Sequence, residues 1–174
     1  MVGGRPFLRP GQWTDDTSMA LCLAESLIAR GGFDAHDQMA RYVSWWREGH
    51  RSSTGECFDI GMTVRDALAR FERTGDPWAG STDPRTAGNG SLMRLAPVVL
   101  WAHPDLAQAK QLAAASSRTT HAAAEAVEAC MLFAELMHRA LEGATKERCW
   151  RRRQRRVHRA ACGGHRPWRL SAAA

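Results

Sequence analysis

The stretch GQWTDDTSMALCLAESL, residues 11–27, predicts the first helix of the chain. The large apolar residues in it recur at every fourth position, as on the buried face of an amphipathic helix: Met19, Leu23 and Leu27. A pair of glycines follows at 31–32, so we expect the helix to cover residues 14–30. The helix opens on two adjacent carboxylates, Asp15 and Asp16, whose mutual repulsion requires a compensating interaction.

Two interpretations account for this acidic pair. In the first, Thr14 or Asp15 caps the helix, and the carboxylates interact with the positive end of the helix dipole. In the second, the pair binds magnesium or manganese, because these hard cations prefer oxygen ligands and their charge would cancel the repulsion. The two carboxylates and the Thr14 hydroxyl would supply only part of such a ligand shell, and water or distant carboxylates would complete it.

Helical periodicity recurs through most of the chain, and no segment alternates as a strand would. The further helices that we expect cover residues 37–48, 62–74, a segment starting near 91, 105–117 and 122–142. The second helix should bury Met39, Val43 and Trp46, and Pro97 should bend or shorten the helix that starts near 91. The sequence therefore predicts an all-α fold, a compact array of several helices.

Composition limits the class of protein. With 174 residues, 44% of them hydrophobic, the chain is long enough for one globular domain. No apolar run approaches the roughly 20 residues of a membrane span, and the N-terminus lacks the apolar segment of a secretory signal. The five cysteines form no C-x-x-C pair, which favours reduced thiols and a cytoplasmic location over a zinc site or disulfides.

The positive charge of the chain is concentrated at its C-terminus. Residues 146–174 hold ten basic residues and one acid, whereas the rest of the chain is acidic on balance. The run RRRQRR, residues 151–156, has three interpretations: a nucleic-acid or targeting arm, a solvated disordered end, or out-of-frame translation of a GC-rich gene. Helical periodicity stops where the composition changes, which favours the third. We therefore expect a helical domain over 1–147 and an irregular, arginine-rich tail over 148–174.

Three further stretches carry residue types that suit ligand binding. In DPRTAGNGSLMRLAPV, residues 83–98, a glycine-rich turn precedes a helix, which suits either an anion such as phosphate or a flexible connector. In SSRTTHAAAEAVEAC, residues 116–130, His121 is either a polar contact at a helix start or a ligand contact. In SSTGECFDIGMT, residues 52–63, Asp59 precedes a helix and is compatible with simple capping.

Taken in this order, the four stretches resemble the signatures of the ADP-ribosylglycohydrolases. The matching segments are WTDDTSMALCLAESL, SSTGECFDIGMT, AGNGSLMRLAPV and SSRTTHAAAEAVEAC. The chain is most similar to members of the ADP-ribosyl-[dinitrogen reductase] hydrolase type, and the resemblance covers about residues 3–147. Its most specific parts are the W-T-D-D-T and G-N-G-S-L-M-R motifs.

The resemblance implies an all-α enzyme with a pair of Mg²⁺ or Mn²⁺ ions that hydrolyses the N-glycosidic bond between ADP-ribose and an arginine side chain. The substrate would be an ADP-ribosylated protein or small molecule, with no membrane as partner. Carried over to this sequence, the resemblance implies metal ligands at Thr14, Asp15 and Asp16. It implies catalytic carboxylates at Asp16 and at Asp59, the latter positioning or activating water. It implies substrate contacts at Gly88, Asn89, Gly90, Ser91 and, on the adenosine side, His121.

Two motifs of the family have no counterpart in this sequence. These are a glycine-rich G-D-A-x-G type segment ahead of W-T-D-D and a D-x-D-T motif near the C-terminus, since the last aspartate here is Asp105. We therefore expect an incomplete, truncated member, and the alternative function is an inactive remnant that binds metal and ADP-ribose weakly or not at all. Nucleic-acid binding through the tail is disfavoured, because Trp150 and Trp168 are too sparse for a stacking platform.

Overall fold

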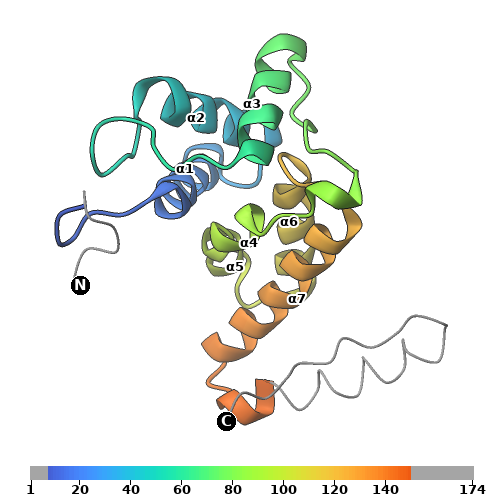
Figure 1. Cartoon of the computed structure of the whole chain (residues 1–174). Helices are drawn as coiled ribbons and strands as arrows, with labels where there is room; N and C mark the ends of the chain where they lie inside the picture. The colour runs from blue at the N-terminus through green and yellow to red at the C-terminus, as the bar shows by residue number, and fades with distance from the viewer. Residues whose placement is uncertain (1–7, 150–174) are drawn as a thin grey trace, which may run out of the picture. The chain divides into compact units, whose positions relative to one another are not determined.

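The computed structural model describes residues 8–149 (Figure 1). Over this range the backbone forms helices α1 to α7, one 3-10 helix and a short helical turn near its end, and an isolated bridge joins Ser81 to His121. These residues form no strand, so the predicted all-α class is confirmed. The chain divides into two compact units, Met1–His138 and Arg139–Ala174, which are described separately.

Helix α1, Asp15–Arg30, forms where the apolar spacing predicted it. Thr14 is its N-cap residue and has an extended backbone. Gly31 ends the helix in the left-handed conformation, with φ at 66°, and its N–H donates to the Leu27 carbonyl. The predicted apolar stripe of this helix is buried, so α1 is anchored along its length by the core.

Helices α2, Ala35–Glu48, and α3, Met62–Thr74, follow the predicted ranges closely. The prediction for the buried face of α2 was only partly right. Met39 is buried as expected, but Tyr42 and Trp45 are the other fully buried apolar side chains of α2, whereas Val43 and Trp46 are only partly buried. The buried face is displaced by one position because Tyr42 packs under the guanidinium of Arg94, a distant contact that periodicity does not reveal.

The helix predicted to start near residue 91 is divided into α4, Gly90–Met93, and α5, Ala96–Ala102. Pro97 lies in the first turn of α5, where its missing N–H costs no helical hydrogen bond. The predicted interruption is thus confirmed. Helices α6, Leu106–Arg118, and α7, Ala124–Leu141, match their predicted ranges to within two residues.

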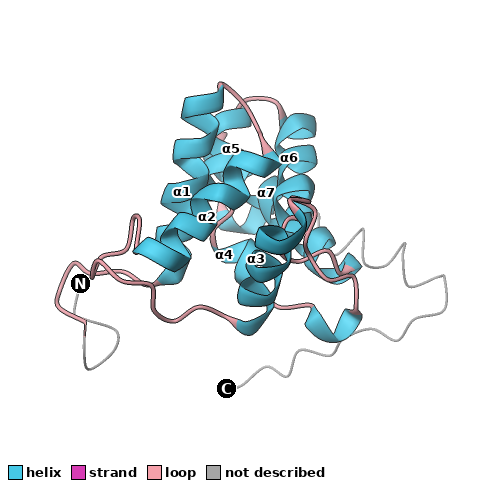
Figure 2. Ribbon diagram, turned by 90° about the horizontal axis from the view of Figure 1, so that it is seen from above, coloured by secondary structure: helices cyan, strands magenta, loops and turns pink. Residues whose placement is uncertain are grey.

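Helix α1 is the structural centre of the first unit. It packs against α2, α4 and α5, while α2 also packs on α3 and α5 on α6 (Figures 1 and 2). Each fully buried leucine or methionine side chain contributes roughly 1.5–3 kcal/mol to this core. The core side chains include Cys22, Leu23, Met39, Trp45, Leu68, Leu95, Val98 and Val99.

In the second unit the structure describes residues 139–149. Gly143 is left-handed there, with φ at 75°, and a helical turn covers 146–149. Most of the tail predicted over 148–174 lies outside the described residues, which end at residue 149. Across the described part of the chain, no helix has the length and apolarity that a membrane crossing requires.

Gly80 permits a close backbone approach between the loop after α3 and the end of α6. Its N–H donates to the Arg118 carbonyl at 3.2 Å. A Cβ added here would lie 2.5 Å from that carbonyl oxygen and 2.9 Å from the backbone nitrogen of His121. Gly80→Ala should therefore lower the free energy of unfolding by about 2 kcal/mol, measured by urea denaturation.

Gly32→Ala is the matched control, because a Cβ at Gly32 meets nothing within 4 Å. This variant should differ little from the wild type. Equal stability of the Gly80→Ala and Gly32→Ala variants would contradict the close approach.

Candidate functional site

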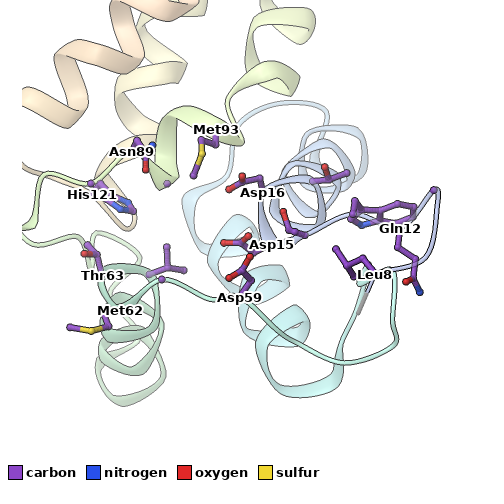
Figure 3. A pocket seen from close by; sticks show the side chains of 18 residues that line it. Leu8, Gln12, Asp15, Asp16, Asp59, Met62, Thr63, Asn89, Met93 and His121 are labelled. Carbon is purple, nitrogen blue, oxygen red and sulfur yellow. The ribbon is translucent and has the colours of Figure 1, made fainter. Parts of the chain in front are cut away.

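A cavity of about 830 Å³ opens in the first unit, where the start of α1, the start of α3 and the glycine-rich turn meet (Figure 3). Its walls come from segments that are far apart in the sequence. The residues that line it are Leu8, Gly11, Gln12, Trp13, Thr14, Asp15, Asp16, Thr17, Asp59, Gly61, Met62, Thr63, Val64, Gly88, Asn89, Gly90, Met93 and His121.

Three carboxylates share one side of this cavity: Asp15 and Asp16 from the first turn of α1, and Asp59 from the loop before α3 (Figure 3). Burial, reinforced by the charges of Asp16 and Asp59, raises the pKa of Asp15 to about 6. Burial and the charge of Asp59 also raise the pKa of Asp16, although the Arg94 guanidinium opposes this. The three groups therefore form a cluster of mutually repelling charges, here called the acidic cluster.

Capping does not explain the acidic cluster fully. Thr14 occupies the N-cap position, yet its side chain makes no capping hydrogen bond. Backbone N–H groups of Asp15 and Asp16 lower the pKa of Asp15 only in part, and the pKa remains well above its ordinary value. The dipole of α1 thus offsets the repulsion without removing it.

Asp59 is held in an unusual backbone conformation. Its φ is 62°, in the left-handed region that costs non-glycine residues energy. The loop that carries it is attached to the segment before α1: the Trp13 N–H donates to Ser53 Oγ at 3.1 Å, Ser53 Oγ donates to the Trp13 carbonyl at 2.6 Å, and Trp13 Nε1 donates to the Arg51 carbonyl at 3.2 Å. These bonds fix the start of this loop beside the start of α1.

Glu25, further along α1, also binds this loop. Its carboxylate accepts hydrogen bonds from Arg51 and from Arg41 Nη1 at 3.3 Å, and lies 2.7 Å from His50 Nε2. Hydrogen bonds from Arg51, together with His50, lower the pKa of Glu25 to about 2. This carboxylate therefore stays charged and joins α1, α2 and the loop over the whole physiological pH range.

The glycine-rich turn forms the opposite wall of the cavity. Asn89 and His121 lie across the cavity from Asp15 and Asp59 (Figure 3). A Cβ on Gly90 would lie only 3.1 Å from His121 Cε1. The imidazole can pack this closely against the turn because Gly90 has no side chain. Burial, together with Arg94, lowers the pKa of His121 to about 4, which keeps the ring neutral near pH 7.

The predicted site residues converge on this cavity with one exception. Ser91 does not line it, because its side chain turns into the core, where Oγ accepts a hydrogen bond from Ser117 Oγ at 2.9 Å and lies 3.4 Å from Cys130 Sγ. Ser91, for which the resemblance implies a substrate contact, therefore lies outside the lining of this cavity. The other predicted residues lie on the wall of the cavity: Thr14, Asp15, Asp16, Asp59, Gly88, Asn89, Gly90 and His121.

Sequence reasoning missed several residues of the wall, chiefly Gln12, Trp13, Met62, Thr63 and Met93. Each of them lies within four positions of a predicted site residue. The neighbourhood was therefore visible in the sequence, but the direction in which each side chain points was not. Trp13, Met62 and Met93 are also exposed large apolar residues, so they add an apolar rim to a polar cavity.

The oxygen donors of Thr14, Asp15 and Asp16 fit a hard divalent cation such as Mg²⁺ or Mn²⁺. Their donor chemistry is right, and a positive ion would relieve the repulsion that raises the pKa of Asp15. These residues would supply part of one coordination shell.

Comparisons with known proteins found related chains. A family model described as ADP-ribosylglycohydrolase matches residues 1–173. A solved chain from an ADP-ribosylglycohydrolase-related protein complex has a TM-score of 0.68 and 52% identity, over 84% of this chain and 47% of that one.

Two curated relatives extend the comparison. ADP-ribosylarginine hydrolase Tri1 of Pseudomonas putida (strain GB-1) is 48% identical over 148 residues, covering 84% of this chain and 40% of the relative. ADP-ribosyl-[dinitrogen reductase] glycohydrolase of Rhodospirillum rubrum is 31% identical over 156 residues, covering 90% of this chain and 50% of the relative. The chain thus spans half or less of the length of these relatives.

The acidic cluster should cost stability when no cation is bound. Because the folded protein holds the Asp15 proton more tightly than the unfolded chain does, stability should fall as the pH rises from about 4 to about 6. Asp15→Asn should therefore stabilise the protein above this window by about 1 kcal/mol, after allowance for screening of a half-exposed group. The gain should vanish near pH 4, as measured by thermal unfolding in EDTA.

The control is Asp66→Asn, at an exposed position on α3. This change should leave the stability unaltered at either pH. An Asp15→Asn variant that is no more stable than the wild type at about pH 8 would show that the cluster stores no repulsion.

Proposed function

The chain belongs to the ADP-ribosylglycohydrolase family, and from this premise we propose that it hydrolyses the N-glycosidic bond of ADP-ribosylated arginine with the help of Mg²⁺ or Mn²⁺. One observation supports the proposal above the others. The acidic cluster and the glycine-rich turn with His121 face each other across a single cavity. The substrate would be an ADP-ribosylated protein or a small molecule that carries the same linkage.

The size and character of the cavity suit this ligand. Ligand pockets commonly measure about 300–1,000 Å³, and a cavity of about 830 Å³ has room for a nucleotide-sized molecule. Its acidic side suits the ribose next to a cationic guanidino group. Its opposite side offers backbone at Gly88 and Gly90, where a diphosphate can approach closely because no side chain intervenes.

Thr14, Asp15 and Asp16 would hold the cation. A bound divalent ion would orient the ribose hydroxyls and lower the pKa of a water molecule near the scissile bond. The charge of Arg94 favours the ionised form of Asp16 and so opposes the rise in its pKa that burial and Asp59 cause.

The residues of the chain itself would do the rest of the chemistry. Breaking a glycosidic bond develops positive charge on the ribose, which the carboxylates of Asp59 and Asp16 would stabilise. A carboxylate oxygen of Asp59 would accept a proton from the attacking water as the C–N bond breaks, and the departing guanidino nitrogen of the arginine would take up that proton. Trp13, Met62 and Met93 would shield the reacting centre from bulk water.

A direct assay tests the proposal. The purified chain should release ADP-ribose from ADP-ribosylarginine in the presence of MgCl₂ or MnCl₂, and EDTA should abolish the release. Asp15→Asn or Asp59→Asn should lower kcat/KM by about 100-fold or more, because each removes a charge from the reacting centre.

Asp66→Asn should leave the rate unchanged, since this carboxylate lies outside the cavity. If the wild-type chain releases no ADP-ribose, the catalytic proposal is wrong. Calorimetric titration with ADP-ribose then distinguishes a binding remnant from a chain that binds nothing.

A further inference from the structure

Arg94, the residue that ends α4, is a fully buried cation. Its guanidinium lies 4.8 Å from the ring centre of Tyr42. Among the described residues its charge acts on the carboxylate of Asp16 without a direct ion pair. Nε and Nη1 have no hydrogen-bond partner among the described residues. Burying a guanidinium without a direct ion-pair partner is costly in free energy. We therefore asked which contacts of Arg94 require it to be buried here.

The third guanidinium nitrogen, Nη2, makes the hydrogen bonds of Arg94. Arg94 Nη2 donates to the Ser116 carbonyl at 3.1 Å and to Thr120 Oγ1 at 2.8 Å. Thr120 Oγ1 in turn lies 2.9 Å from His121 Nδ1, and both residues are buried. Arg94, Thr120 and His121 thus form a continuous chain of hydrogen bonds, here called the relay, which ends at the cavity.

The direction of the relay follows from its first member. A guanidinium can only donate, so Thr120 Oγ1 must accept from it and has one proton left to give. Within the described part of the chain, His121 Nδ1 is the acceptor within reach of that proton. If Nδ1 carried a proton instead, the buried Thr120 hydroxyl would accept twice and its own proton would remain unpaired, which is unfavourable.

His121 Nδ1 is therefore the acceptor, and the ring proton is on Nε2. Burial and Arg94 both disfavour a second proton, so the ring is neutral at pH 7. Nε2 lies on the side of the ring that faces the turn: a Cβ on Gly88 or on Gly90 would lie 3.4 Å from it, and Cε1, beside it in the ring, would lie 3.1 Å from a Cβ on Gly90. The two glycines leave this N–H uncovered on the cavity side.

We propose that Arg94 and Thr120 are positioning residues that fix His121 as a neutral Nε2–H donor facing the cavity, and that the bound ligand presents a hydrogen-bond acceptor to it. A guanidinium or ammonium group, which can only donate, is excluded at this position. Where the ligand is ADP-ribosylarginine, which rests on the proposed function, the relay orients the nucleotide side toward His121 and the arginine toward the acidic cluster. A ribose, phosphate or adenine acceptor atom satisfies the donor.

The test measures the tautomer directly in the full chain labelled with ¹⁵N-histidine. Long-range ¹H–¹⁵N correlation spectra at about pH 7 should show His121 protonated on Nε2 alone, with the signals assigned by their loss in His121→Gln. Thr120→Val should abolish this preference and weaken ADP-ribose binding about tenfold, as measured by calorimetry. Thr120→Ser, which keeps the hydroxyl, should retain both properties.

A wild-type His121 that is protonated on Nδ1, or on both nitrogens, overturns the inference without any variant. Equal tautomer populations in Thr120→Val and Thr120→Ser overturn it as well. If the tautomer behaves as expected but no form of the protein binds ADP-ribose, the relay is established and the proposed function fails, so the two failures are distinguishable.

Discussion

Asp15, Asp16 and Asp59 place three mutually repelling carboxylates on one side of a cavity, and the structure around them must hold this arrangement. Nothing in local helix formation requires three carboxylates on one side of a cavity, and burial makes their proximity more costly. Protein folding tolerates such a cost where function needs it. The proposed cation site would explain this cost. A bound divalent cation would be coordinated by the carboxylates, would cancel their mutual repulsion, and would attract the hydroxyl groups of a sugar.

The surrounding scaffold holds the charged groups in place. The first turn of α1 supplies two of them, and the core under α1 prevents that turn from moving. The loop that carries the third, Asp59, is attached through the hydrogen bonds between Trp13 and Ser53 and through the ion pairs of Glu25 with His50 and Arg51. On the opposite wall, Arg94 and Thr120 hold the His121 ring from behind. Both walls are therefore fixed by contacts made outside the cavity.

Much of this could be predicted from the sequence, because apolar spacing and glycine stops define helices locally. The range of α3 was predicted to the residue, and Pro97 correctly marked a break. The failures share another cause. The buried face of α2 and the inward turn of Ser91 depend on partners that are distant in sequence, Arg94 and Ser117. Motif resemblance named residues that, except for Ser91, line one cavity, but only packing decides which side chain reaches it.

Whether the acidic cluster holds a divalent cation can be measured by titrating the chain with Mn²⁺ and following the loss of the electron paramagnetic resonance signal of the free ion. We expect saturable binding that Mg²⁺ displaces and that disappears in the Asp15→Asn/Asp16→Asn double variant, with circular dichroism showing that its helices are retained. Binding of equal strength in the wild type and the double variant, or no binding to either, would contradict this expectation: the acidic cluster would then have no role in holding a cation.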